Sequence, residues 1–309
     1  MRHIVAGAVC LALSIAAGAS AAAPPAVVAT GPPSFAEVQA AAPRDTRRGV
    51  LKPKAQTLLI TENANIERLY RATPLKDPDR PRLLRRLAEG YVELAASAER
   101  DAAEADAKRA AAVGPRRADL HRRQAIKSRK VVKAARDKAR SSYRQLRKLH
   151  PTFCSYPKNP PGKRGCGDEV TYYLALAAER AGELDKARQA YLDLVKTWPK
   201  SRFIPHAYYA FGALFLAESQ NDPAKWPITQ KFFEEVVKHP PPDNPLFGFA
   251  LYLLARCHDA QGQHHRALEA LHKVEGYANR YPQLRYATEL GQAAATDASA
   301  LRTGQPLSP

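Results

Sequence analysis

The sequence predicts an all-α fold: a solenoid of paired helices in which one pair is extended into a long antiparallel hairpin. Alanine is abundant while Val, Ile and Thr are sparse, small and large apolar residues recur at fixed spacing, and one repeat is enlarged almost symmetrically. The 309 residues, 45% hydrophobic and 25% charged, suffice for a sizeable core. This composition excludes a wholly disordered, collagen-like or polytopic membrane protein.

The N-terminal residues predict a secretory signal peptide over 1–23. A positively charged start precedes an apolar stretch over 4–17 and small residues at 19–23. A lipoprotein would need a cysteine at the cleavage point, whereas Cys10 lies inside the apolar stretch. Since no second apolar run of membrane length follows, we expect a mature chain without a transmembrane segment. Its expected location is the periplasm or the outer part of the envelope.

Residues 24–54 are rich in Pro and Ala, with a short basic stretch, and predict a linker or disordered arm. The helical pattern begins after them. Ile66, Leu69 and Pro74 have the spacing of a second helix of a pair, with Glu62 where Ala is expected. We therefore expect an N-terminal half-repeat at the start of a region spanning 55–151.

The clearest repeat runs from Asp168 to Pro199. Small or large apolar residues occupy both helices, a glycine marks the turn, and a proline ends the unit: Leu174, Ala175, Gly182, Ala187, Tyr191, Leu194 and Pro199. Small residues let two helices approach, and glycine suits a left-handed turn. The pattern resembles the tetratricopeptide repeat, a 34-residue helix–turn–helix unit, with Thr171 at the usual Trp position.

Two further copies follow, giving three repeats over 168–282. The second carries Phe211 and Gly212, then an enlarged turn at 219–227 and a second helix that begins near Ile228. The third carries Leu254, Ala255, Gly262, Ala267, Leu271 and Val274. Residues 283–309 predict a capping helix and a tail.

The enlarged repeat lies upstream. Ala139, Tyr143, Leu146 and Pro151 match the spacing of the second helix at 187–199, and Leu87, Ala88 and Tyr91 match a first helix. Ala88 and Ala139 are 51 residues apart, where an ordinary repeat has 12. Because Gly114-Pro115 lies near the middle, both helices should be extended, forming one hairpin over about 82–149 with an alanine-rich seam.

Most of the excess positive charge lies on this hairpin. The chain has 48 Lys+Arg and 30 Asp+Glu, and residues 108–148 hold 16 of the cations and only two acids. We expect cross-arm pairs Asp106–Arg123, Glu99–Lys130, Glu93–Arg136 and Glu89–Arg140. The surplus either solvates a protruding hairpin or contacts an anionic surface, through Arg116, Arg117, Arg122, Lys127, Arg129 and Lys133.

Two cysteines flank a Pro-, Gly- and Lys-rich loop at 152–167. In an exported protein, the spacing of Cys154 and Cys166 favours a disulfide, although two reduced thiols remain the alternative. Cys257 lies in an apolar helical run and is expected to be a small buried hydrophobe.

No catalytic constellation is found. The sequence has no His-Glu-x-x-His, no phosphate-binding glycine loop and no Gly-x-Ser-x-Gly turn. We therefore expect a protein that is not an enzyme and has no cofactor or metal. Nucleic acid fits the charge but not the export signal, and is ranked last among partners.

The resemblance to tetratricopeptide repeats implies a concave groove, lined by the first helices, that binds protein segments. Position 5 of each first helix carries a tyrosine: Tyr172, Tyr209 and Tyr252. With Arg180 and Arg256 these tyrosines form the predicted partner site. The alternative is that the tyrosines pack against the helix of the next repeat.

Two functions follow as expectations. The first is an envelope scaffold or adaptor that binds protein partners in the groove. The second is a structural protein that uses the basic hairpin on cell wall or membrane. Stretches such as LLRRLAEGYVEL and GELDKARQAY are also similar to exported repeat proteins of delta-proteobacterial, myxobacterial type, some of which belong to motility or envelope-assembly machinery.

Overall fold

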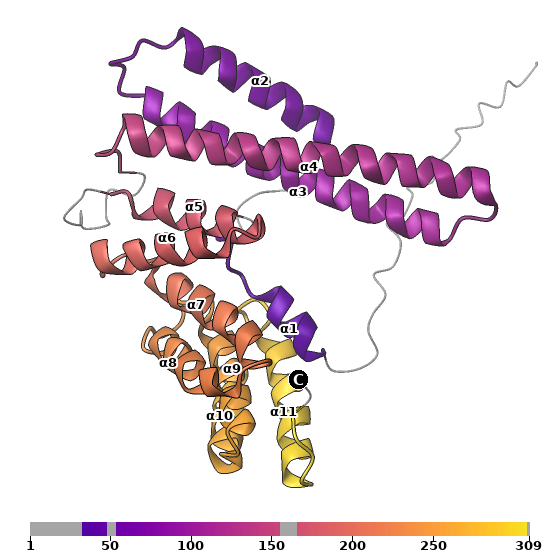
Figure 1. Cartoon of the computed structure of the whole chain (residues 1–309), viewed down its shortest axis with the longest axis vertical. Helices are drawn as coiled ribbons and strands as arrows, with labels where there is room; N and C mark the ends of the chain where they lie inside the picture. Colours follow the sequence, from indigo (N-terminus) through magenta and orange to yellow (C-terminus); the bar gives the residue numbers. More distant parts are fainter. Residues whose placement is uncertain (1–32, 48–53, 155–165, 308–309) are drawn as a thin grey trace, which may run out of the picture.

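The computed structural model describes residues 33–47, 54–154 and 166–307, and within them the chain is all-α, as predicted (Figure 1). The signal peptide and most of the Cys-flanked loop lie outside the described residues. The helices are α1 (Phe35–Ala41), α2 (Gln56–Ala72), α3 (Arg80–Ala110), α4 (Pro115–Leu149), α5 (Asp168–Arg180), α6 (Leu184–Thr197), α7 (Ile204–Ser219), the short 3₁₀ helix η1 (Pro223–Lys225), α8 (Trp226–Val237), α9 (Phe247–Ala260), α10 (His264–Arg280) and α11 (Ala287–Arg302).

The pair α3 and α4 forms the expected long hairpin, which lies across one end of the molecule (Figure 1). Its turn contains Gly114 at φ 92°, a conformation that favours glycine. The seven alanines expected at the seam are all buried: Ala95, Ala98, Ala102, Ala105, Ala125, Ala135 and Ala139. At 1.5 Å per residue, the 31 residues of α3 extend over about 45 Å.

The predicted charge register across the hairpin is wrong by six residues. Asp106 pairs with Arg129, and Glu99 pairs with Arg136. Helical side chains lean toward the N-terminus of their helix, so α3 acids point away from the hairpin tip and α4 arginines point toward it. For an acid of α3 to meet an arginine of α4, the Cα atom of the arginine must therefore lie farther from the hairpin tip than the Cα atom of the acid.

The other two expected cross-arm pairs are absent from the described contacts. Glu93 instead pairs with Arg86, and Glu89 with Arg85, one or two turns away on the same helix. Arg140 pairs with Asp137 and with Glu183, the residue that precedes α6.

The repeats form the helix pairs α5/α6, α7/α8 and α9/α10, and α11 packs on α10. The predicted turn glycines Gly182 and Gly262 have φ values of 76° and 69°. At Gly212, a Cβ atom would lie 2.5 Å from Cε1 of Phe233, so this position must be small for α7 and α8 to pack. α8 begins at Trp226, two residues before the expected position.

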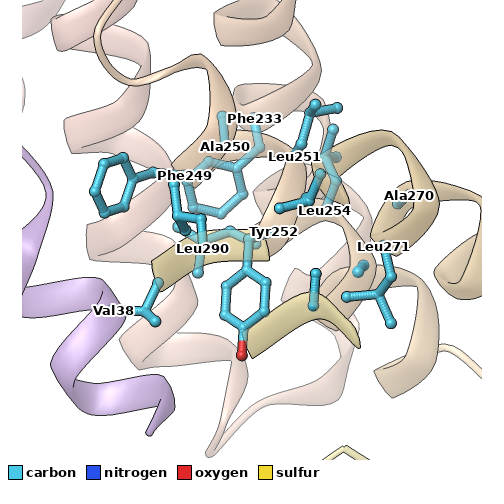
Figure 2. Close-up of a cluster of buried hydrophobic side chains, with 14 of the residues drawn as sticks. Val38, Phe233, Phe249, Ala250, Leu251, Tyr252, Leu254, Ala270, Leu271 and Leu290 are labelled. Carbon is cyan, nitrogen blue, oxygen red and sulfur yellow. The ribbon is translucent and has the colours of Figure 1, made fainter. Parts of the chain in front are cut away.

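The expectation of a linker or disordered arm over 24–54 is wrong for residues 33–47. Ser34 and Glu37 form a reciprocal cap at the start of α1. Figure 2 shows Val38 of this helix within a cluster that includes Phe249, Tyr252 and Leu290. The high Pro and Ala content led to the prediction of a linker, although α1 is a capped helix that buries Val38. No described helix is long and apolar enough to cross a membrane.

Candidate functional site: the inner face and the segment that covers it

The five predicted groove residues lie on the first helices of the three repeats. Tyr172 and Arg180 are on α5, Tyr209 is on α7, and Tyr252 and Arg256 are on α9. We call the surface that carries these five residues the inner face, and residues 33–47 the N-terminal segment. The prediction of an exposed tyrosine ladder is wrong, because the tyrosines are 0%, 1% and 1% exposed.

The N-terminal segment covers the tyrosine of α5. The hydroxyl of Tyr172 donates a hydrogen bond of 2.5 Å to the main-chain carbonyl of Arg44. Its ring stacks on Phe203, with the centroids 5.0 Å apart. Burial raises the pKa of Tyr172 far above its ordinary value, so the hydroxyl stays a donor at physiological pH.

Tyr209 and Tyr252 are buried for different reasons. The ring of Tyr209 packs edge-on against Phe233, and its hydroxyl has no hydrogen-bond partner among the described atoms. The hydroxyl of Tyr252 donates to Asp297 of α11 at 2.7 Å. Tyr252 therefore contacts a helix beyond its own repeat, which is the alternative that the sequence left open, whereas Tyr209 packs against α8, the second helix of its own repeat.

A bidentate ion pair fixes the N-terminal segment to α5. Nη1 and Nη2 of Arg44 donate to the two carboxylate oxygens of Glu179 at 2.6 and 2.5 Å. The hydroxyl of Tyr191 donates to the same carboxylate at 2.9 Å. Planar pairs of this kind combine charge with fixed geometry, so they select arginine over lysine.

A buried carboxylate lies next to this pair. Asp45 accepts two hydrogen bonds of 2.8 Å from Arg47 and one of 3.0 Å from Arg180. The guanidinium of Arg47 also lies 3.8 Å from the ring centroid of Tyr173 and donates to the hydroxyl of Tyr143. Arg180 thus contacts the segment, as expected of a groove residue, but its contact is within the chain.

Arg256 contacts α1, at the other end of the N-terminal segment. It is 7% exposed, pairs with Asp297 at 3.0 Å, and lies 4.4 Å from the ring centroid of Phe35 of α1. Because Arg256 is buried and the side chain of Asp297 is only 18% exposed, this ion pair belongs to the packing of the inner face.

Sequence reasoning missed Arg44, Asp45, Thr46 and Arg47. The only signal was the basic stretch Arg44-Asp45-Thr46-Arg47-Arg48, which we interpreted as part of a linker. It also missed Glu179 and Tyr173, whose hydroxyl is 2.7 Å from that of Thr46. Alternation of charge and hydroxyl groups is compatible with many exposed loops, so the pattern alone does not identify a bound segment.

His206 of α7 is buried beside Tyr172. Its ring packs edge-on against Tyr172, and neither ring nitrogen has a described partner. Burial, followed by the charges of Arg202 and Arg44, lowers its pKa to about 4. The imidazole is therefore neutral at physiological pH.

The hairpin cations fall into two groups. Arg122 pairs with Asp119 and Arg129 pairs with Asp106, so the positive charges of these two arginines are partly compensated. The remaining four predicted surface residues are exposed and form no ion pair with another described residue: Arg116, Arg117, Lys127 and Lys133. Whether any of them binds an anionic surface stays a prediction.

The described cysteines are Cys154, Cys166 and Cys257, and the first two lie close together. The Cα atoms of Cys154 and Cys166 are 4.8 Å apart, within the range that a disulfide spans. Cys257 is fully buried, and burial raises the pKa of its thiol. No group of three or more His, Cys, Asp or Glu in the described part of the chain is arranged to hold a metal ion.

Comparison with protein families matches the chain to the tetratricopeptide repeat at residues 169–201 and 249–283. These stretches cover α5/α6 and α9/α10, the first and third predicted repeats. Comparison with curated proteins gives no match. The chain is therefore an all-α helical solenoid, two stretches of which match the tetratricopeptide repeat.

Proposed function

We propose that this protein is a scaffold of the cell envelope that binds a segment of a partner protein on its inner face. Its tetratricopeptide repeats imply protein partners. One observation supports the inner face as the site: an extended segment of the chain itself already lies there. That segment is bound through a main-chain carbonyl, an arginine, an aspartate and an apolar side chain, the contacts a peptide ligand makes.

The contacts indicate the chemistry of the partner. Glu179 selects a guanidinium, Arg180 selects a carboxylate one residue later, and the cluster around Val38 takes a short apolar helix. A partner with an apolar turn followed by Arg-Asp would compete with the N-terminal segment. The segment would then act as a built-in occupant that keeps the inner face closed until such a partner arrives.

An exchange experiment tests this site. A protease site is inserted between Val50 and Leu51 of the full chain, so that after cleavage only non-covalent contacts hold the segment. A fluorescein-labelled peptide of residues 33–47 is then added and its anisotropy measured. We expect saturable binding, weakened at least tenfold by Glu179→Gln and unchanged by Glu269→Gln, the same change at an exposed carboxylate on α10.

Three results would contradict the proposal. The cleaved segment could stay bound through gel filtration with no exchange, the cleaved protein could unfold, or Glu269→Gln could weaken binding as much as Glu179→Gln. The first two would make the segment a permanent part of the core. The third would make the peptide binding non-specific.

The envelope location is part of the proposal and rests on the leader-like residues 1–23. We expect the protein to be recovered from the envelope or periplasmic fraction with a mass that lacks about the first 23 residues. An intact N-terminus in the cytoplasmic fraction would refute export. Kinship with the exported myxobacterial repeat proteins likewise stays a proposal.

A second candidate function is attachment of the hairpin to an anionic membrane or wall. The hairpin tip exposes apolar side chains close in sequence to arginines that form no ion pair with another described residue. Val113 is 86% exposed, Leu120 53% and Ile126 43%. Arg116 and Arg117 lie between the first two in sequence. Apolar side chains beside cations suit the interface of an anionic bilayer.

Deleting residues 100–130 and rejoining the arms with a short turn separates the two functions. A scaffold keeps its partners after this deletion, whereas a surface-binding protein leaves the envelope fraction. Sedimentation with phosphatidylglycerol vesicles gives a direct measurement. Binding that survives Val113→Asp and Arg116→Glu would contradict attachment through the tip.

A further inference from the structure

A pocket of about 450 Å³ lies between the α3/α4 hairpin and the α5/α6 pair, and it borders the inner face at Arg180. Pockets of 300–1,000 Å³ are the size that holds small organic ligands. Its apolar lining comes from three helices: Val92, Ala95 and Ala96 on α3, Val132 and Ala139 on α4, and Ala177 on α5. The small side chains that let the hairpin close also leave this space beside it.

The polar lining of the pocket is dominated by cations. Six of them meet here with only three carboxylates, those of Glu99, Asp137 and Glu183. The cations come from the N-terminal segment, α4 and α5: Arg47, Arg129, Lys133, Arg136, Arg140 and Arg180. Two of these, Arg129 and Lys133, were expected from the sequence to contact an anionic surface.

Much of the donor capacity around the pocket is unused. Arg129, Arg136 and Arg180 each form one ion pair, with Asp106, Glu99 and Asp45. A guanidinium carries five N–H donors, so each retains donors for a further acceptor. Lys133 forms no ion pair with another described residue. A carboxylate or similar anion would therefore gain charge-assisted hydrogen bonds here.

We propose that this pocket binds an organic anion with an apolar body, of the size of a medium-chain carboxylate. An inorganic ion leaves the alanine and valine walls without contacts, and a neutral apolar molecule offers no acceptor to Lys133 or to the remaining guanidinium donors. An anion with an apolar body satisfies both parts of the lining. The pocket has this lining while the N-terminal segment covers the inner face, because Arg47 belongs to that segment and Arg180 pairs with its Asp45.

Calorimetry on the full chain tests the ligand class, with octanoate, 1-octanol and acetate as probes at equal ionic strength. We expect octanoate to bind at least tenfold more tightly than either of the others. Equal binding of octanol would show an apolar cavity only, and equal binding of acetate would show an ion site only. Either result overturns the proposal.

Matched variants test the position. Lys133→Glu should weaken octanoate binding at least fivefold, while Lys127→Glu, the same change outside the pocket on the same helix, should leave it within twofold. Ala96→Leu, which fills the pocket with a good helix former, should abolish binding while helical content is unchanged.

Equal loss in both lysine variants would assign the effect to diffuse surface charge. Retention of binding in Ala96→Leu would place the ligand elsewhere. Saturable binding of an acidic peptide with no octanoate binding would indicate a protein segment as ligand. Each of these outcomes contradicts the pocket as a site for a small organic anion.

Discussion

The guanidinium of Arg44 and the carboxylate of Glu179 meet in a planar, two-bond ion pair although they are 135 positions apart in the chain. Both side chains are less than one-fifth exposed. The pair fixes an N-terminal segment that the sequence predicts to be a linker onto the first tetratricopeptide repeat.

Breaking this pair should destabilise the protein. Arg44→Ala leaves the largely buried carboxylate of Glu179 with Tyr191 as its one side-chain donor among the described residues. We expect a loss of about 1–3 kcal/mol in the free energy of unfolding, measured by urea denaturation. Arg82→Ala, which removes an exposed pair with Asp79, should cost less than about 0.5 kcal/mol. Equal effects would mean that the segment contributes nothing to stability.

Tyr209→Ala should destabilise the core rather than only weaken partner binding. The ring is buried against Phe233, so its removal leaves a cavity and should cost about 3–5 kcal/mol. Tyr209→Phe should be nearly neutral, because the hydroxyl has no described partner. A thermal unfolding midpoint unchanged by Tyr209→Ala would contradict this and would support the prediction that Tyr209 is an exposed groove residue.

Two glycine substitutions should have opposite effects. Gly212→Ala places a Cβ atom 2.5 Å from the ring of Phe233 and should cost about 1–3 kcal/mol through overpacking. Gly276→Ala meets nothing within 4 Å inside α10 and should stabilise by up to about 1 kcal/mol through helix propensity. Chemical denaturation of the two variants checks this, and a loss in both would contradict the difference in packing.

His206 should make stability fall as the pH drops. Its pKa is about 4 in the folded chain and near 6.5 when exposed, so below pH 6.5 protons bind the unfolded state more readily. This contribution is fully present above pH 6.5 and is lost toward pH 4, by on the order of 1 kcal/mol per pH unit.

The variant His206→Phe isolates that contribution. Phenylalanine keeps the ring packing against Tyr172 and removes two buried nitrogens without described partners, so we expect higher stability at pH 7 and a shallower decline toward pH 4.5. Thermal unfolding of both proteins across this range measures it. Parallel pH profiles would assign the acid sensitivity to other groups.

Cys154 and Cys166 should form a disulfide in the exported protein. Closing a loop of this size stabilises by about 3 kcal/mol when the bond is unstrained. Mass spectrometry without reduction should find the two peptides linked and two hydrogens lighter. Two thiols that react with an alkylating agent would refute the bond.

The helix pairs follow from local sequence. Gly182 and Gly262 mark turns because few other residues adopt a positive φ there, and Ala88, Ala139, Ala175 and Ala187 mark close approaches of helices. The long hairpin could be predicted because the repeat spacing on either side of Gly114 defines where both arms begin and end. These features depend on residues that are close together in the chain, so they can be predicted from a single sequence.

Only the tertiary structure determined what covers the inner face. The position-5 tyrosines are where the repeat pattern places them, but the N-terminal segment covers Tyr172, while Tyr209 and Tyr252 pack against α8 and α11. The charge register of the hairpin likewise depends on the direction in which side chains lean, which offsets Asp106 from Arg129. Spacing along the chain encodes helices and their pairing, whereas burial and ion pairing are decided by segments that the chain brings together from far apart.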